Sequence, residues 1–249
     1  MKLALAGTGQ MGQAVADVAT ARDHRVVATF DTASPLLDAC PDDLNGAEVV
    51  IDFSMPGVVL DHLHTYCQWQ QPAVVGTTGW YDQIDTVAAW VDEYDATLLY
   101  AANFSMGVAL LQRAVAEVLP LLNQLPDYDA YLHEMHHTRK VDSPSGTAHM
   151  LAEMVVEGLA RKSHVEPEAQ HQRIDPAALH VSSTRAGAVF GEHTVGFDSA
   201  FDQLEFIHRA KNRRGFAFGA LRAAEWLPGR CGLFTLDDVL ADWLSTSRK

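Results

Sequence analysis

The stretch LALAGTGQMG, residues 3–12, decides the fold of the amino-terminal half. Its apolar start predicts a short buried strand, and the G-x-G-x-x-G that follows predicts a tight turn into a helix. Glycines at these positions let the backbone approach a pyrophosphate, which the free N–H groups at the helix start then bind. A glycine turn that only fits a strand–helix corner is the alternative. We expect a cofactor site at Gly7, Thr8, Gly9, Gln10, Met11 and Gly12.

An acidic residue stands where a dinucleotide-binding unit places its ribose ligand. Asp31 follows the apolar run 26–30, about 20 positions after the glycines. Its carboxylate can accept hydrogen bonds from the adenosine ribose, and residues 32–34 provide no cation for a 2′-phosphate. We therefore predict NADH as the cofactor, with NADPH possible but weaker.

The first half alternates short apolar runs with helical patterns. Runs at 3–6, 26–30, 49–53, 73–75 and 97–100 predict strands, and the spacing over 14–21, 58–69 and 84–94 predicts helices. Repeated strand–helix–strand units indicate a parallel sheet of the Rossmann type. Two loops follow its strands, and each is either a plain turn or a nicotinamide-side loop of the cofactor site. They contain Gly76, Thr77 and Thr78, and then Ala101, Ala102, Asn103 and Phe104.

The second half has a different pattern. A helix is predicted over 107–122, a strand over 129–135 and a helix over 146–161. Strands over 180–184, 191–197 and 203–209, joined by short polar turns, indicate a mixed and largely antiparallel sheet. Helices over 216–226 and 236–244 close the chain. The predicted fold class is α/β: a Rossmann-type parallel sheet, residues 1–105 plus 216–249, with an inserted α+β mixed-sheet substrate domain, residues 106–215.

Composition excludes several classes of protein. The 249 residues are 48% hydrophobic and 20% charged, which favours a folded core over disorder. A net charge of −14 disfavours binding to nucleic acid or to anionic membranes. No apolar run approaches the roughly 20 residues that a membrane span needs. The short amino-terminal apolar run does not fit a signal peptide, and three widely spaced cysteines indicate a reducing, cytoplasmic environment.

The charges are unevenly distributed. Between Arg25 and Arg113 there is no lysine or arginine, whereas basic residues return in the second half. The pattern places an anionic substrate on the second half. Ordinary solvated surface charge is the alternative for most of these residues.

The richest stretch is EMHHTRKVDSPSGTA, residues 134–148. With His133 it matches the zinc-protease pattern H-E-x-x-H, which needs a helix to point both histidines at one ion. The preceding residues alternate as a strand does, and there His133 and His137 would stand roughly 13 Å apart. A zinc site is therefore disfavoured, and we predict no metal.

Acid–base chemistry is the alternative use of this stretch. Histidine can supply a proton near neutral pH, and Lys140, four positions after His136, can bind a carboxylate or donate a proton. Ser145, Gly146 and Thr147 begin the helix, where free N–H groups and a hydroxyl form a second carboxylate site. These features suit a small dicarboxylate with a reducible bond.

The chain resembles the dihydrodipicolinate reductase family, also called 4-hydroxy-tetrahydrodipicolinate reductase. The resemblance is carried by E-x-H-H-x-x-K-x-D-x-P-S-G-T-A at 134–148, G-T-T-G at 76–79, A-N-F-S at 102–105 and R-A-G…G-E-H-T at 185–194. It implies NAD(P)H-dependent reduction of a cyclic dicarboxylate in lysine and diaminopimelate synthesis, by a homotetramer assembled through the inserted sheets.

The resemblance also implies roles for individual residues. His136 and Lys140 would be catalytic, His137, Ser145, Gly146 and Thr147 would bind substrate, and Arg213 would lie near the cofactor. The chain departs from the family in a glycine loop that is one residue shorter, and in Thr32, where many members have a basic residue. Two other functions stay open: another NAD-dependent dehydrogenase of an amino acid or its aldehyde, and a non-catalytic NAD(H)-sensing module.

Overall fold

The computed structural model describes residues 1–246 and divides the chain into two compact units. Unit 1 comprises Met1–Met106 and Arg213–Lys249, and unit 2 comprises Gly107–Asn212. The sequence-based boundaries were placed at 105/106 and 215/216. Over the described residues no helix has both the length and the apolarity needed to cross a bilayer. Cys40, Cys67 and Cys231 are free thiols.

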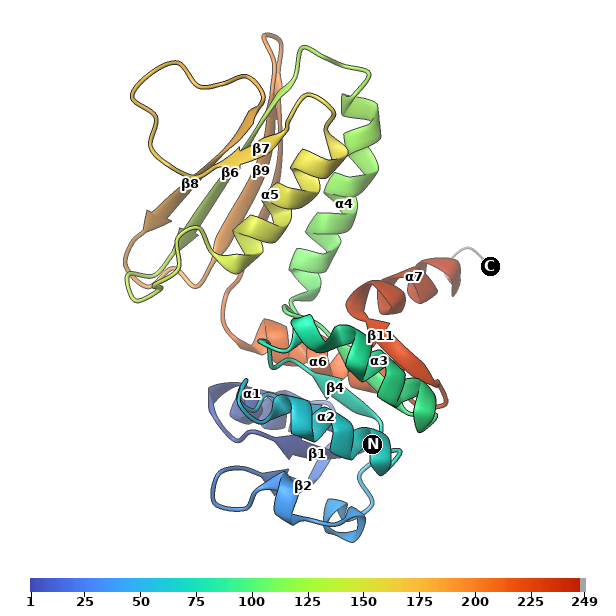
Figure 1. Cartoon of the computed structure of the whole chain (residues 1–249). Coiled ribbons are helices and arrows are strands. Elements are labelled where there is room, and N and C mark those ends of the chain that lie inside the picture. The colour runs from blue at the N-terminus through green and yellow to red at the C-terminus, as the bar shows by residue number, and fades with distance from the viewer. Residues whose placement is uncertain (247–249) are drawn as a thin grey trace. The chain divides into compact units, whose positions relative to one another are not determined.

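Unit 1 is built on a six-stranded, wholly parallel sheet in the order β11-β5-β4-β3-β1-β2 (Figure 1). The chain starts at β1 and moves first to β2 and then to β3, so the order reverses between β1 and β3. Ligands of such sheets bind at this reversal, outside the carboxyl ends of the strands. The strands are β1 Lys2–Ala6, β2 Arg25–Phe30, β3 Val49–Asp52, β4 Ala73–Val75, β5 Thr97–Tyr100 and β11 Gly232–Thr235. The short strand β11 was not expected from the sequence.

Helices cover both faces of this sheet (Figure 1). Helices α1, Gln10–Thr20, and α6, Arg214–Trp226, pack together on one face. On the other face, α2, Val59–Gln68, and α3, Ile84–Glu93, bury their apolar residues with those of the strands. Helix α1 begins at Gln10, four residues earlier than the apolar spacing indicated, so the glycine turn leads directly into it. The remaining elements are η1 Leu36–Asp38, η2 Pro41–Leu44, η3 Tyr81–Gln83 and α7 Leu236–Thr246.

Unit 2 contains a five-stranded mixed sheet in the order β10-β9-β6-β8-β7. Two pairings, β6 with β9 and β9 with β10, are antiparallel, whereas β6 with β8 and β7 with β8 are parallel. The sheet is therefore mixed, as expected, and each antiparallel pairing is longer than either parallel one. Helix α5 returns the chain after β6, so β7 and β8 run in the same direction as β6. The bounds are α4 Met106–Leu122, β6 Asp129–His136, α5 Gly146–Gly158, β7 His164–Glu166, β8 Ala178–Arg185, β9 Glu192–Asp198 and β10 Gln203–Arg209.

Helices α4 and α5 lie over the same face of this sheet, and no helix within residues 107–212 covers the opposite face (Figure 1). The alternation of β6 follows from this arrangement. Ala130 and Leu132 are buried under the helices, and the next two positions with the same orientation are Glu134 and His136. The strand therefore carries two polar side chains into the buried side, beyond the apolar core.

Candidate active site

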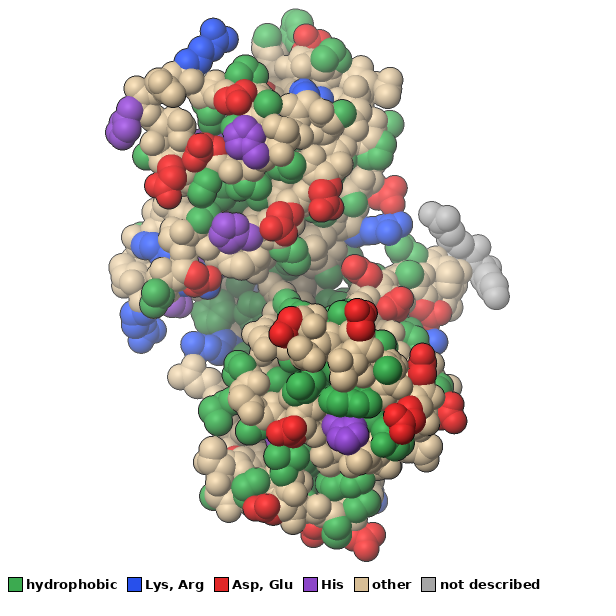
Figure 2. Space-filling model, viewed as in Figure 1, with side chains coloured by type: hydrophobic (Ala, Val, Ile, Leu, Met, Phe, Trp, Pro, Cys, Tyr) green, Lys and Arg blue, Asp and Glu red, His purple; other side chains and the backbone are tan. Residues whose placement is uncertain are grey.

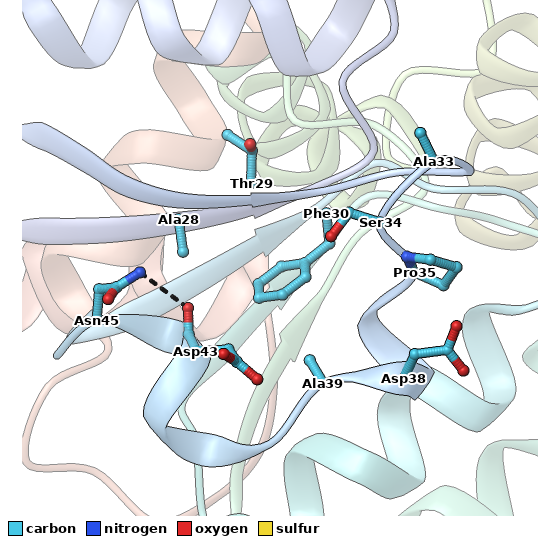
Figure 3. A pocket seen from close by; sticks show the side chains of 10 residues that line it. All are labelled: Ala28, Thr29, Phe30, Ala33, Ser34, Pro35, Asp38, Ala39, Asp43 and Asn45. Atoms are coloured by element: carbon cyan, nitrogen blue, oxygen red, sulfur yellow. Dashed lines mark hydrogen bonds between the residues drawn. The ribbon is translucent and has the colours of Figure 1, made fainter.

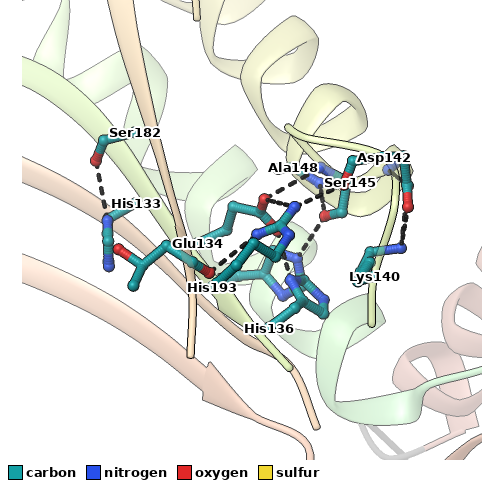
Figure 4. A network of polar contacts seen from close by, with 12 residues as sticks. His133, Glu134, His136, Lys140, Asp142, Ser145, Ala148, Ser182 and His193 are labelled. Atoms are coloured by element: carbon teal, nitrogen blue, oxygen red, sulfur yellow. Dashed lines mark hydrogen bonds and ion pairs between the residues drawn. The ribbon is translucent and has the colours of Figure 1, made fainter. Parts of the chain in front are cut away.

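The carboxylate of Glu134 is the centre of a buried polar cluster in unit 2 (Figure 4). The residue is fully buried, and its Oε1 accepts hydrogen bonds from Nη2 of Arg185 at 2.6 Å and from the backbone N–H of Ser145 at 3.3 Å. Its Oε2 lies 2.6 Å from Nδ1 of His136. One carboxylate thus holds the imidazole and the start of helix α5 together. Arg185 comes from β8, directly beside β6.

The start of α5 is fixed by its first side chain. Ser145 is the N-cap residue, and its Oγ accepts a hydrogen bond from the N–H of Ala148 at 3.2 Å. The same oxygen lies 3.2 Å from Nε2 of His193, and the residue is buried. The sequence proposed Ser145 as a substrate ligand. Its hydroxyl caps the helix and contacts His193, and its role as a substrate ligand stays a prediction.

His136 is held close to neutrality by its surroundings. Burial lowers its pKa, the adjacent charge of Glu134 opposes that effect, and the charges of Lys140 and Arg185 lower the pKa further. The net result is a pKa below the ordinary value. An imidazole in this setting is neutral at pH 7 and takes up a proton when negative charge arrives nearby.

A second histidine stacks against the first. The rings of His136 and His193 meet edge to face, with centroids 5.2 Å apart. Burial, and next the charge of His136, lower the pKa of His193 to about 4. His193 is therefore a neutral partner that fixes the position of the His136 ring. Its signal in the sequence was the G-E-H-T segment, which was not interpreted as part of the site.

Lys140 and the start of α5 share one carboxylate. Nζ of Lys140 donates to Oδ1 and Oδ2 of Asp142 at 2.7 and 3.0 Å. The N–H of Gly146 also points at Oδ2 of Asp142, at 3.4 Å. The cation and the helix N–H predicted to bind a substrate carboxylate are thus brought together, and both contact an acid of the chain itself.

The other predicted residues of this stretch are placed less decisively. His137 follows β6 and is half-buried, and its Nδ1 is buried without a hydrogen-bond partner among the described residues. Thr147 lies in the first turn of α5. These positions border the cluster, and their roles stay predictions.

The zinc-protease pattern does not form a metal site of its own. Residues 129–136 form a strand, as the alternation predicted, and His133 bonds Ser182 at 2.9 Å on the open face, away from His136. The structure brings a different trio together, because Glu134, His136 and His193 have ligand atoms within 4.8 Å of one another. The guanidinium of Arg185 on Glu134 would repel a cation there.

In unit 1 the glycine loop borders a cavity of about 490 Å³. Gly7 has φ of +88°, and a side chain there would overlap the carbonyl of Phe53. The shape of the glycine loop therefore depends on a glycine at position 7. The walls come from the loop after β1, the region around Asp31, and the ends of β3 and α2. They are formed by Gly7, Thr8, Gly9, Phe30, Asp31, Thr32, Pro35, Leu36, Leu37, Phe53, Ser54, Met55, Val58 and His62. Of these residues, only Gly7, Thr8, Gly9 and Asp31 were predicted as cofactor ligands.

Asp31 is oriented by its own loop. Its Oδ1 accepts from the N–H groups of Ala33 and Ser34 at 2.8 and 3.2 Å, and its Oδ2 accepts from Thr8 at 2.9 Å. The bond from Ala33, then that from Thr8, lowers the pKa of Asp31, so the carboxylate is charged at neutral pH. Among residues 1–246, no lysine or arginine lines the cavity. The face of unit 1 in Figure 2 likewise shows many acidic and few basic side chains.

A second hollow of about 470 Å³ lies beside the edge strand β2 (Figure 3). The ring of Phe30 projects into it, and Asp38 and Asp43 are its only charged lining residues in the described part of the chain. A hollow bordered by two acids does not suit phosphates. The glycine-loop cavity is therefore the candidate dinucleotide site.

The remaining predicted cofactor residues do not line that cavity. Thr77 is buried and bonded to Asp52, and Phe104 is a core residue in edge-to-face contact with Phe53. Asn103 accepts from the N–H of Ser105 at 2.8 Å. Arg213 is exposed and precedes α6 as its N-cap residue. Phe104 contributes packing, and contacts of the other residues with a cofactor stay predictions.

A glycine loop at the reversal point of a parallel sheet, combined with a buried acid–base cluster in an inserted domain, defines a two-domain pyridine-nucleotide oxidoreductase. Residues 1–104 match the family model described as dihydrodipicolinate reductase, N-terminus, and residues 107–240 match its C-terminus. The chain belongs to the dihydrodipicolinate reductase family. Members of this family are pyridine-nucleotide-dependent reductases of lysine and diaminopimelate synthesis.

Individual relatives agree with this assignment. The chain is 37% identical over 244 residues to the 4-hydroxy-tetrahydrodipicolinate reductase of Christiangramia forsetii, covering 97% of this chain and 98% of the relative. It is 35% identical over 204 residues to the enzyme of the same name from Neisseria meningitidis, covering 78% and 72%. A dipicolinate-bound dihydrodipicolinate reductase from Paenisporosarcina shares the fold, with a TM-score of 0.76, 21% identity and coverage of 94% and 97%.

Proposed function

We propose that the chain reduces 4-hydroxy-tetrahydrodipicolinate to tetrahydrodipicolinate, with NADH as the preferred donor. The observation that carries the proposal is the buried pair of Glu134 and His136 in the same unit as Lys140 and the start of α5. The reaction takes up one hydride and one proton and releases the 4-hydroxyl group as water. The nicotinamide supplies the hydride, and the chain must supply the proton and bind two carboxylates.

The electrostatics of the cluster suit proton delivery by His136. The free imidazole is neutral because burial and two nearby cations lower its pKa. A bound dicarboxylate offsets those cations and favours the imidazolium. Glu134 then stabilises the charged ring and keeps it oriented. His136 is thus protonated when substrate is present, as a general acid must be.

Lys140 and the N–H groups of α5 bind a substrate carboxylate in this proposal. An ammonium and a helix amino terminus both favour an anion, and here they already converge on one carboxylate, that of Asp142. The carboxylate of Asp142 marks where a substrate carboxylate would bind. His137 and Thr147 border this position and are proposed as further ligands.

The acid–base assignment is tested by His136→Asn, with Lys140→Met as its companion. Loss of the proton donor should lower kcat by about 10²–10⁴-fold. Lys140→Met should mainly raise KM, because it removes a ligand of the substrate. The NADH affinity of both variants should equal that of the unchanged protein, since both residues lie in unit 2. Near-normal kcat in His136→Asn would refute its role as the proton donor, and an unchanged KM in Lys140→Met would refute its role as a substrate ligand.

The NADH preference is proposed on the electrostatics of Asp31. A 2′-phosphate would approach a charged carboxylate in a cavity that no lysine or arginine lines. The ratio of kcat/KM for NADH to that for NADPH should exceed one and should decrease on Asp31→Asn. A preference for NADPH in the unchanged protein would overturn this point and leave the reaction itself untouched.

The open face of the unit 2 sheet supports the proposal of a homotetramer. Tyr131, His133 and Met135 point away from the helices, and the ring of Tyr131 lies over Gly196, where a side chain would overlap it. A half-exposed face of this kind is suited to pairing with a second copy. Light scattering should give the mass of four chains. Tyr131→Glu, which places a charge on that face, should give smaller species.

A further inference from the structure

A second fully buried carboxylate lies in unit 1, at the end of strand β3. Asp52 accepts four hydrogen bonds. Its Oδ1 accepts from the N–H of Ser54 at 2.8 Å and from Oγ1 of Thr77 at 3.2 Å. Its Oδ2 accepts from Nδ1 of His62 and from the hydroxyl of Tyr66, each at 2.9 Å.

These bonds join three segments that are distant in sequence. Ser54 lies in the loop after β3, Thr77 belongs to the loop after β4, and His62 and Tyr66 lie on α2. The backbone strengthens the junction, because the N–H of Gly76 donates to the carbonyl of Asp52 at 2.8 Å. Asp52 is thus the point where the carboxyl ends of two neighbouring strands and one helix are fastened together.

The junction lies behind the wall of the glycine-loop cavity. Ser54 and His62 line that cavity, whereas Asp52 and Tyr66 do not. Phe53, between Asp52 and Ser54, also lines it, and its ring packs so closely on Gly76 that a side chain at Gly76 would overlap it. Of the four hydrogen-bond donors to Asp52, Ser54 and His62 therefore reach the cavity and Thr77 belongs to the Gly76–Thr78 loop. Tyr66 is directed into the core.

A carboxylate is the side chain this junction requires. A charged group in the core is costly unless hydrogen bonds satisfy it, and Asp52 has no lysine or arginine as a partner. Burial raises its pKa, and the bonds and charge of His62 with the bonds of Ser54 lower it, leaving the pKa below the ordinary value. A carboxylate only accepts, with about four lone-pair sites for four donors, whereas an asparagine would place its own N–H₂ donors against two of them.

We propose that Asp52 is a positioning residue for the dinucleotide cofactor, acting through Ser54, His62 and Thr77. The inference rests on the proposed function, because it assumes that the glycine-loop cavity binds NADH. Asp52 itself does not contact the cofactor. It fixes the spacing of the loops that do, so its loss weakens NADH binding more than it weakens folding.

The test measures NADH binding to the purified full chain, by the fluorescence of the bound nicotinamide, together with the melting temperature of each variant. Asp52→Asn should raise the Kd for NADH by about tenfold or more, as expected for loss of hydrogen bonds to a charged acceptor. Thr77→Val and His62→Gln, which each replace one of the donors to Asp52, should raise it by about threefold to fivefold.

Tyr66→Phe is the matched control, since it removes the donor that faces the core. It should lower the melting temperature while keeping the Kd for NADH within about twofold of the unchanged protein. Asp82→Asn, an exposed acid of the same unit, should change neither quantity. If Asp52 only stabilised the fold, the Kd for NADH would rise in proportion to the loss in melting temperature in every variant, Tyr66→Phe included. That result would contradict the inference.

The outcomes separate this inference from the proposed function. An unchanged protein that does not bind NADH would overturn the proposed function. An unchanged protein that binds NADH, with Asp52→Asn binding it equally well, would overturn only the role of Asp52. If Asp52→Asn does not fold, the comparison of Thr77→Val and His62→Gln with Tyr66→Phe decides. Equal affinities in all three would refute the inference.

Discussion

The two units each bury a carboxylate that holds a histidine by Nδ1, yet they neutralise it differently. Glu134 in unit 2 pairs with the guanidinium of Arg185 as well as with His136. Asp52 in unit 1 is satisfied by His62, two hydroxyls and one backbone N–H, without lysine or arginine. The comparison indicates a division of labour. Unit 2 adds the permanent charge of an arginine, which suits an anionic substrate and proton transfer, whereas unit 1 satisfies its carboxylate with donors other than lysine or arginine, which suits a fixed binding surface.

The largest expected effect is on the free energy of unfolding, and it comes from the buried ion pair of unit 2. Arg185→Met leaves the carboxylate of Glu134 buried without its cation, which costs about 3–5 kcal/mol in such pairs. The matched control is Arg209→Met, because the Arg209–Glu192 pair is exposed and contributes roughly 0–1 kcal/mol. Urea unfolding followed by circular dichroism measures both.

The double variant Glu134→Gln with Arg185→Met sharpens this result. Removing both charges should recover part of the stability, since the uncompensated carboxylate is then gone. All five tryptophans lie in unit 1, so tryptophan fluorescence reports on that unit separately. Similar losses for Arg185→Met and Arg209→Met would show that the buried cation of unit 2 is dispensable, and the contrast with Asp52 would then fail.

The second effect is on stability against pH. The folded-state pKa of His193 is about 4, below the ordinary value near 6.5. As pH falls, the unfolded chain binds the proton first, so this stability is complete above about pH 6.5 and is lost as pH decreases toward 4. The loss is roughly 3 kcal/mol, and the lowered pKa of His136 acts in the same direction.

The stabilisation by Asp52 is unchanged over the same pH window. Its lowered pKa means that its stabilisation persists until pH falls below the ordinary aspartate value. Between pH 6.5 and 4, hydrogen exchange should therefore accelerate in β6 and β9 before it accelerates in β3 and α2. His193→Asn should remove much of this acid sensitivity, and His180→Asn, on the open face of the sheet, should not. Uniform acceleration across both units would contradict the comparison.

The elements of the fold that could be predicted from the sequence are those that local residue patterns determine. The glycine turn after β1, the alternation of strands and helices, and the strand rather than helix at 129–136 follow from the spacing of a few neighbouring residues. Strand β11 was missed because its four residues begin with a glycine and lie apart from the other strands in sequence. Its pairing with β5 depends on tertiary contact.

The site was predicted only where its residues are consecutive. His136, Lys140 and Gly146 lie in one stretch and were found together. Arg185 and His193 reach Glu134 and Ser145 from β8 and β9, and the pairing that brings them there is a property of the sheet. The same holds for Asp52, whose partners in α2 and after β4 become neighbours only on folding. Glu134 belongs both to the zinc-protease pattern and to the family motif, but neither pattern indicates its role as the centre of the cluster.

The smallest expected effect concerns Asp142, and it sharpens the comparison from the substrate side. In unit 2 the cation and the helix N–H that should bind substrate already contact the carboxylate of Asp142, so substrate must displace it. Asp142→Asn removes this competitor, and KM for the substrate should fall by about threefold, a difference of roughly 0.7 kcal/mol in binding. The control is Glu153→Gln, which removes an exposed negative charge from helix α5. Any acid that is neutralised makes the chain attract an anion slightly more, and this variant should leave KM nearly unchanged. A higher KM in Asp142→Asn would mean that Asp142 orients Lys140 for the substrate. Asp142 would then be one of the charged residues of unit 2 that support substrate binding.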